Sequence, residues 1–158
     1  MNKYINLVIP EHLHQQLKKH LFPGDGMEAA AILLCNRYEG KRLKLLAKDV
    51  ITVPYDECKS RQNDFISWPG LYLESAIDAA EAASMSILLV HSHPGGLLDF
   101  SLQDDESDAL TIPSLYQGGT AIHGSAIMVP DGRLQARIYH EGVHARIVDL
   151  VSVPGDNI

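Results

Sequence analysis

The stretch from Ser86 to Asp105 constrains the fold of this chain most, because it combines a buried strand, a sharp turn and a helix start in close succession. Ile87-Leu88-Leu89-Val90 is an aliphatic run, which is typical of a strand covered on both faces. Pro94-Gly95-Gly96 then ends the strand and lets the chain turn sharply. Ser101, followed three residues later by Asp104, has the pattern of a helix cap with a carboxylate in the first turn. The sequence therefore predicts a strand–turn–helix unit here.

Two histidines and one aspartate accompany this unit. Side chains two positions apart on a strand share a face, so His91 and His93 point the same way if the strand continues through them. Asp104 lies at the expected start of the following helix. Two imidazoles and one carboxylate that converge at a strand end and a helix start make a three-ligand zinc site, with a fourth position left for water. Without a metal ion, the three groups would be crowded together without charge balance.

A second pair of histidines has the same spacing and serves as a comparison. His12 and His14 lie in a segment where Leu13, Leu17 and Leu21 recur every four residues, which is a helical period. Residues two apart on a helix point about 200° apart. This pair cannot chelate one ion, and we expect it to face solvent.

Length and composition favour one globular domain that spans residues 1–158, because a chain of 158 residues can fill one core and is short for two. No apolar run reaches the length of a membrane span, so we expect no membrane partner. The first residues lack the apolar core and cleavage site of a secretory signal, which favours a cytoplasmic location. Cys35 and Cys58 form no Cys-x-x-Cys pattern, and we expect them to be reduced packing residues.

The formal net charge of −7 argues against a nucleic-acid partner, since such proteins usually present a basic stripe. Lys18-Lys19 and Lys41-Arg42 are too short to form one. A partner or substrate of basic character is easier to accommodate.

The remaining pattern predicts an α/β domain with a mixed, curved sheet and with helices before and within it. Apolar periodicity and turn residues divide the chain into the following expected elements: a strand over 4–9, a helix from 10 to 22, strands over 27–35 and 42–53, a polar loop over 55–69, a helix over 71–84, the strand before His91, a helix from about 102 that weakens before Pro113, a loop at Gly118, Gly119 and Gly124, a hairpin of 125–129 and 134–139, and a closing strand or helix over 144–153.

Glu28 is the one charge in the apolar run Met27–Cys35. An ionised carboxylate at the start of a buried strand costs several kcal/mol unless it is partnered, which favours a paired or functional role. Partial burial would raise its pKa into a range useful for a general base, and it is the best candidate for that role. The alternative is a surface acid at a strand end.

The pattern His91-x-His93-x7-Ser101-x2-Asp104, preceded by a glutamate at the head of an apolar strand, resembles the JAMM motif of the JAB/MPN metalloprotease family. The resemblance covers residues 5 to 140 and implies a JAB/MPN-like mixed curved β-sheet flanked by helices. It implies that His91, His93 and Asp104 bind one zinc ion per chain, that Glu28 is the general base, and that Ser101 donates a hydrogen bond to the oxyanion. A hydroxyl at a helix N-terminus also suits that role on physical grounds, and it can serve as a plain helix cap at the same time.

Two departures from the family pattern leave the ligands intact: Phe100 stands where the family often has proline, and Ala30-Ala31 where it often has Cys-Gly. The chain also lacks the long insertions of eukaryotic deubiquitinases and resembles the compact prokaryotic branch. Members of that branch are often encoded with enzymes that resemble ubiquitin-activating enzymes, which makes such a protein a possible partner.

The leading functional hypothesis is a zinc-dependent isopeptidase or peptidase, a hydrolase that cleaves after the C-terminal glycine of a ubiquitin-like protein. This reaction would serve either precursor processing or deconjugation. One alternative is a zinc hydrolase of the same fold that acts on a non-protein substrate, and another is a non-catalytic scaffold. A zinc deaminase is excluded because the chain lacks Pro-Cys-x-x-Cys.

Acidic residues flank the ligand set, and ubiquitin-like tails commonly carry arginine before their final glycines. We therefore expect some of these acids, Asp99, Glu106 and Asp108, to steer a basic tail toward the metal. The alternative is that they complement the helix dipole and face water. Trp68 lies in the polar loop and either borders a substrate groove or covers the core.

Overall fold

The computed structural model describes residues 3–116, 122–140 and 144–155, and it confirms a mixed α/β fold. Its elements in chain order are β1 (Tyr4–Val8), α1 (Glu11–Leu21), β2 (Ala30–Glu39), β3 (Arg42–Thr52), a 3-10 turn (Tyr55–Glu57), β4 (Ser60–Arg61), β5 (Ile66–Ser67), α2 (Gly70–Ala83), β6 (Ser86–Ser92), α3 (Leu102–Leu115), β7 (His123–Met128), β8 (Leu134–His140), β9 (His144–Ile147) and β10 (Leu150–Ser152).

Eight strands form one sheet in the order β10-β1-β3-β2-β6-β7-β8-β9. The pairs β1–β10, β1–β3 and β6–β7 are parallel, and the other neighbours are antiparallel. The chain passes from β9 into β10 through Val148 and Asp149. Val148 donates its backbone N–H to Ala136 of β8, and Asp149 donates to Ile5 of β1. The sheet therefore curls until its two ends meet, as the expected curvature requires.

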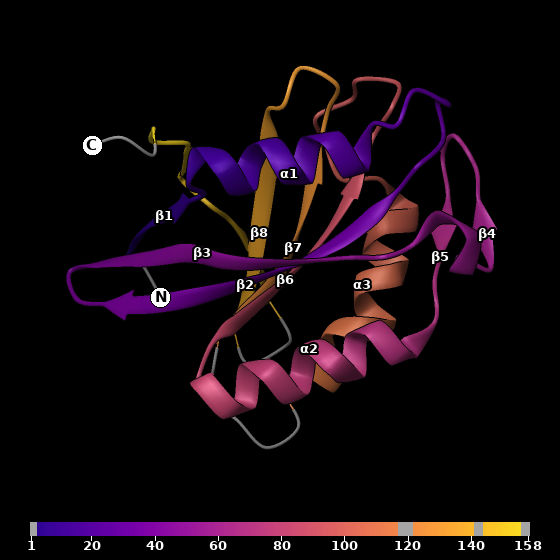
Figure 1. The fold of residues 1–158 in the computed structure, drawn as a ribbon. Helices are drawn as coiled ribbons and strands as arrows, with labels where there is room; N and C mark the ends of the chain where they lie inside the picture. The colour runs from indigo at the N-terminus through magenta and orange to yellow at the C-terminus, as the bar shows by residue number, and fades with distance from the viewer. Residues whose placement is uncertain (1–2, 117–121, 141–143, 156–158) are drawn as a thin grey trace.

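Helices cover both faces of the curled sheet (Figure 1). Helix α1 buries Leu13, Leu17 and Leu21 against one face, while α2 and α3 pack on the other. Strand β6 lies between the two cores: Leu88 and Val90 face α1, and Ile87 and Leu89 face α2 and α3. The aliphatic run is thus covered on both faces, as predicted. None of the helices in the described part of the chain is long and apolar enough to cross a membrane.

Four expected elements differ in the structure. The apolar run becomes β2 only at Ala30, so Glu28 precedes the strand. The expected polar loop contains the short β4–β5 hairpin, whose two strands were too brief to show a period. Helix α3 continues through Pro113, although proline removes one backbone hydrogen bond. Burial of Ile112 and Leu115 against the sheet stabilises the helix by about 1.5–3 kcal/mol for each side chain, which offsets that loss. The predicted loop glycines Gly118 and Gly119 lie outside the described residues.

Gly124 is the fourth difference, because it lies inside β7 and not in a loop. A Cβ atom at this position would lie 2.0 Å from the carbonyl oxygen of Arg137 on β8. The glycine is therefore required by the close approach of the two strand backbones.

Candidate metal centre

The end of β6 places the two histidines on the face of the sheet that α3 covers. His91 continues the alternation of Ile87 and Leu89. Two hydrogen bonds with Ala29 hold the neighbouring residue, Ser92: its N–H donates to the Ala29 carbonyl at 3.0 Å, and its Oγ accepts the Ala29 N–H at 2.9 Å. His93 donates its backbone N–H to Met128 of β7 at 2.9 Å. Hydrogen bonds on both sides thus fix the backbone that carries the imidazoles.

The two imidazoles and the carboxylate of Asp104 meet as the sequence predicted. Nε2 of His91 lies 2.9 Å from Oδ1 of Asp104, and Nε2 of His93 lies 3.1 Å from Oδ2. The two Nε2 atoms are 3.1 Å apart. In a tetrahedral zinc site with the usual bond lengths, ligand atoms are about 3.3 Å apart. The two nitrogens and the Asp104 carboxylate, whose two oxygens each lie next to a different histidine, are thus about as far apart as the ligand atoms of a zinc site.

Asp104 is oriented by the start of α3. Ser101 is the N-cap: its Oγ accepts the N–H of Asp104 at 3.1 Å, and Asp104 Oδ2 accepts the N–H of Ser101 at 2.8 Å. This reciprocal pair is a capping box with aspartate in the glutamate position. Burial alone would favour a neutral Asp104, but hydrogen bonds from His91 and His93 hold the pKa of its carboxyl well below the usual range. The Asp104 carboxylate therefore stays ionised, as a metal ligand must.

The proton position on His93 follows from its second nitrogen. Nδ1 lies 2.8 Å from the carbonyl oxygen of Leu97, and a carbonyl can only accept, so Nδ1 carries the hydrogen. In the neutral ring Nε2 then has a free lone pair that points at the centre of the site. Burial disfavours a charged His93, but its hydrogen bonds with Asp104 and Leu97 outweigh that effect, and the pKa of His93 is raised.

Glu28 lies on the other side of the histidines. One atom of its carboxylate and one nitrogen of each histidine lie within 4.8 Å of one another, so these three residues could also hold a metal ion. The side chain is 5% exposed, and no hydrogen bond reaches its carboxylate from the residues that the structure describes. Burial raises the pKa of Glu28 to about 7. The charges of His91 and His93 lower this pKa, whereas the charges of Asp104 and Asp64 raise it further.

The backbone of Glu28 is fixed although it belongs to no strand. Its N–H donates to the carbonyl of Gln62 at 2.7 Å, and its carbonyl accepts from Nε of Arg61 at 2.7 Å. Both partners belong to the β4–β5 hairpin or adjoin it. The hairpin therefore fixes the position of the backbone that carries the candidate base.

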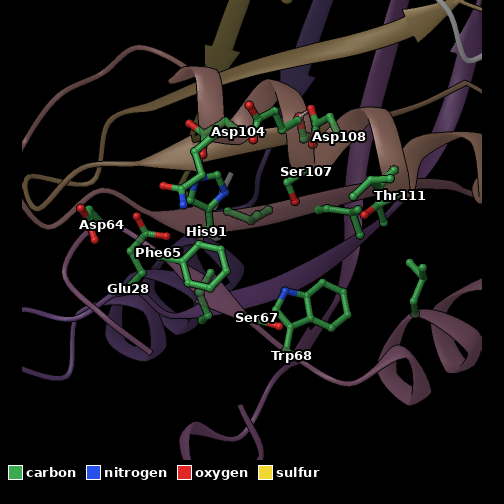
Figure 2. A pocket seen from close by; sticks show the side chains of 18 of the residues that line it. Glu28, Asp64, Phe65, Ser67, Trp68, His91, Asp104, Ser107, Asp108 and Thr111 are labelled. Carbon is green, nitrogen blue, oxygen red and sulfur yellow. Dashed lines mark hydrogen bonds and ion pairs between the residues drawn. The ribbon is translucent and has the colours of Figure 1, made fainter. Parts of the chain in front are cut away.

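A cavity of about 440 Å³ opens beside the metal site. Figure 2 shows Phe65 and Trp68 on one side of it and Asp104 and Ser107 of α3 on the other, with Glu28 and His91 at one end. Trp68 also packs against the core cluster of α2 and α3, so it both borders the groove and covers the core.

The other acids expected near the site occupy different environments. Glu106 is exposed and lines the cavity, whereas Asp99 is exposed on the preceding loop and does not line it. Asp108 lines the cavity but is only 8% exposed, and its Oδ2 accepts hydrogen bonds from Arg137, Ser125 and Tyr139. The alternative interpretation, in which these acids face water, is therefore wrong for Asp108.

Asp64 lines the cavity near Glu28, and we did not predict it as a site residue from the sequence (Figure 2). Its only signal was its place in the segment that also holds Phe65 and Trp68.

The second pair of histidines, His12 and His14, lies on a helix, α1, as expected. His12 is exposed, but His14 is half-buried and its Nε2 contacts the carbonyl of Gly132 at 2.8 Å.

The family model of the prokaryotic homologues of the JAB domain matches residues 10–139. This match includes the glutamate, both histidines, the serine and the aspartate. The chain belongs to this family, which is a class of α/β domains built around the JAB fold. No curated protein matches the chain.

The solved structures support the fold alone. One is the solution structure of a structural-genomics protein from Desulfitobacterium hafniense, with a TM-score of 0.59 and 12% sequence identity. The match covers 95% of each chain.

Proposed function

We propose that this protein is a zinc-dependent isopeptidase or peptidase that cleaves after the C-terminal glycine of a ubiquitin-like protein. The convergence of His91, His93 and Asp104 within 2.9 to 3.1 Å carries the proposal, because it combines a zinc-type donor set with membership of the JAB family. A hydrolytic centre also needs a base, and Glu28 supplies a buried carboxylate with a raised pKa beside the same histidines.

Each residue has a distinct task in this reaction. His91, His93 and Asp104 would hold the zinc ion, which would supply Lewis-acid chemistry: a lower pKa for a bound water and polarisation of the scissile carbonyl. Glu28 accepts a proton from the attacking water and returns it to the leaving amine, a transfer for which a pKa near neutrality is well matched. Ser101 has its hydroxyl hydrogen available, because its oxygen is the acceptor in the capping box, and it donates to the oxyanion.

The shape and charge of the cavity support an extended, basic peptide as substrate. The groove runs between α3 and the Asp64–Trp68 segment, and aromatic rings line one wall. Asp64 and Glu106 are exposed acids in this groove that can attract a tail containing arginine. Asp108 contributes less to steering, since Arg137 compensates its charge.

The test is cleavage of a ubiquitin-like protein fused through its C-terminal glycine to a reporter peptide. We expect the zinc-loaded protein to release the reporter, and a chelator to stop the release until zinc is restored. Glu28→Gln is the matched control, since the amide keeps the shape of the side chain but cannot accept a proton, and it should bind zinc yet lose most turnover. Cleavage that persists in chelator or in Glu28→Gln would contradict the proposal.

A further inference from the structure

The half of helix α3 that presents Asp104 lacks apolar anchoring. The apolar residues that α3 buries, Ile112 and Leu115, lie in its C-terminal half. In the first two turns Leu102, Asp105 and Glu106 are exposed, and the buried residue of the second turn is polar, Asp108. Apolar packing therefore does not determine how the first turn of α3 lies against the histidines.

Arg137 of β8 contacts this half of the helix at three points. Its Nε and Nη2 donate to Oδ2 of Asp108 at 3.1 and 2.9 Å, and its Nη1 donates to Oδ1 of Asp105 at 2.7 Å. Its guanidinium also lies over the ring of Phe100, 3.8 Å from the centroid. One side chain, 7% exposed, thus holds the residue before the cap, the first turn and the second turn.

The sheet in turn fixes Arg137 and its partner. Asp108 Oδ2 also accepts hydrogen bonds from Ser125 of β7 at 2.5 Å and from Tyr139 of β8 at 2.7 Å. Strand β7 pairs directly with β6, where His91 lies opposite Ile127. Charge-assisted hydrogen bonds therefore fix the helix to β7 and β8, and β7 pairs with the strand that leads to the histidines.

We infer that Arg137 is a positioning residue for the metal centre, which holds α3 so that Asp104 reaches the position between His91 and His93. The inference rests on the proposed metal site but not on the proposed substrate. A planar guanidinium can hold two carboxylates and a ring at once, whereas a lysine ammonium is a point charge. Groups that orient metal ligands typically contribute 10- to 100-fold to metal affinity.

The experiment compares Arg137→Met with Arg37→Met. Arg37 is a matched control, because it is also a largely buried strand arginine with a carboxylate partner, Glu39, but its other partner is Ser86 at the start of β6. Zinc affinity is measured by competition with a chelator, well below the melting temperature, and cobalt(II) absorption reports the coordination geometry.

We expect Arg137→Met to bind zinc on the order of 10- to 100-fold more weakly and to lose the strong visible absorption of tetrahedral cobalt(II). Arg137→Lys should show a smaller loss of the same kind, which keeps the test decisive if Arg137→Met fails to fold. Arg37→Met should melt at a lower temperature but keep both the zinc affinity and the cobalt spectrum. A purely structural role for Arg137 would lower only the melting temperature.

Wild-type zinc affinity and cobalt spectrum in folded Arg137→Met or Arg137→Lys would overturn the inference. A wild-type protein that binds neither ion would overturn it together with the proposed function. Tight, Arg137-dependent zinc binding without cleavage of ubiquitin-like fusions would overturn the proposed substrate and leave the inference standing.

Discussion

Arg61 and Glu28 are joined through the backbone: Nε of Arg61 donates to the carbonyl oxygen of Glu28 at 2.7 Å. The same guanidinium pairs with both carboxylate oxygens of Asp25 at 2.8 and 3.1 Å and lies 4.6 Å from the ring centroid of Tyr55. It therefore holds the segment that carries Glu28 against the hairpin that forms one wall of the groove.

Arg61→Ala should lower turnover while leaving zinc bound. Displacing a catalytic group by a fraction of an ångström costs on the order of tenfold or more in rate, and the three proposed ligands lie on other elements. The measurement is kcat for cleavage of the fusion, together with zinc content. Lys59→Ala, which alters an exposed cation next to the same hairpin, should change neither. Lost zinc in Arg61→Ala would show that Glu28 and its segment support the metal directly.

His93→Ala should lose the metal, because two remaining ligands hold zinc weakly. The purified wild-type protein should carry about one zinc ion per chain. Elemental analysis of both proteins checks this, with His12→Ala as a control for removal of an imidazole outside the site. Undiminished zinc in His93→Ala would rule out the assigned ligand set.

Ser101→Ala should lower kcat on the order of 10²-fold if one oxyanion donor is lost. Loss of the helix cap should also lower the free energy of unfolding by about 1 kcal/mol. The two effects separate by measuring kcat on fully folded protein and stability by denaturant. Ser75→Ala on the exposed face of α2 is the control and should leave kcat unchanged. A loss of stability with unchanged kcat would show that Ser101 acts only as a helix cap.

Removing the exposed acids Asp99 and Glu106 together, as Asn and Gln, should lower kcat/KM at low salt and flatten its salt dependence. Steering charges act on encounter and are screened by salt, with a Debye length of about 8 Å at physiological ionic strength. Asp108 is left intact because of its bond to Arg137. The control changes Glu74 and Asp78, two exposed acids of α2 that do not line the groove. Equal salt profiles in all three proteins would contradict steering.

His123 should make the metal-free protein less stable below pH 6.5. The side chain is 4% exposed, and its Nδ1 accepts the N–H of Ile87 at 2.9 Å. Burial, with a smaller effect of the Arg37 charge, lowers its pKa to about 4. Above pH 6.5 the ring is neutral in both folded and unfolded states, so it adds no pH dependence. Between pH 6.5 and 4 the unfolded chain binds a proton that the folded chain does not, and stability falls by roughly 3 kcal/mol.

Denaturant unfolding of metal-free wild type and His123→Asn at pH 7 and pH 4.5 tests this. Asparagine can accept the same N–H without titrating. The variant should start less stable at pH 7, because part of the ring is lost, but lose less stability on acidification. Equal losses in the two proteins would assign the acid sensitivity to other groups.

The sequence predicted the convergence of His91, His93 and Asp104 better than their surroundings, for a physical reason. His91 and His93 follow the two-residue period of β6, and Asp104 follows Ser101 in a capping pattern, so local geometry alone places these side chains. Arg137 and Gly124 act through contacts with elements distant in sequence, which no local pattern records. The β4–β5 hairpin escaped prediction because its strands are two residues long.

Oδ2 of Asp104 takes part in two sets of contacts: it accepts the N–H of Ser101 in the cap of α3, and it contacts His93 in the proposed metal centre. Helix ends fray as short local openings, far more often than the whole fold unfolds. Melting of the first turn of α3 would move this oxygen away from the histidines, and an ion bound as proposed would then be held by two nitrogens. The opening rate of one helical turn would then limit the lifetime of a zinc ion bound as proposed, and the ion would exchange while the sheet stays intact.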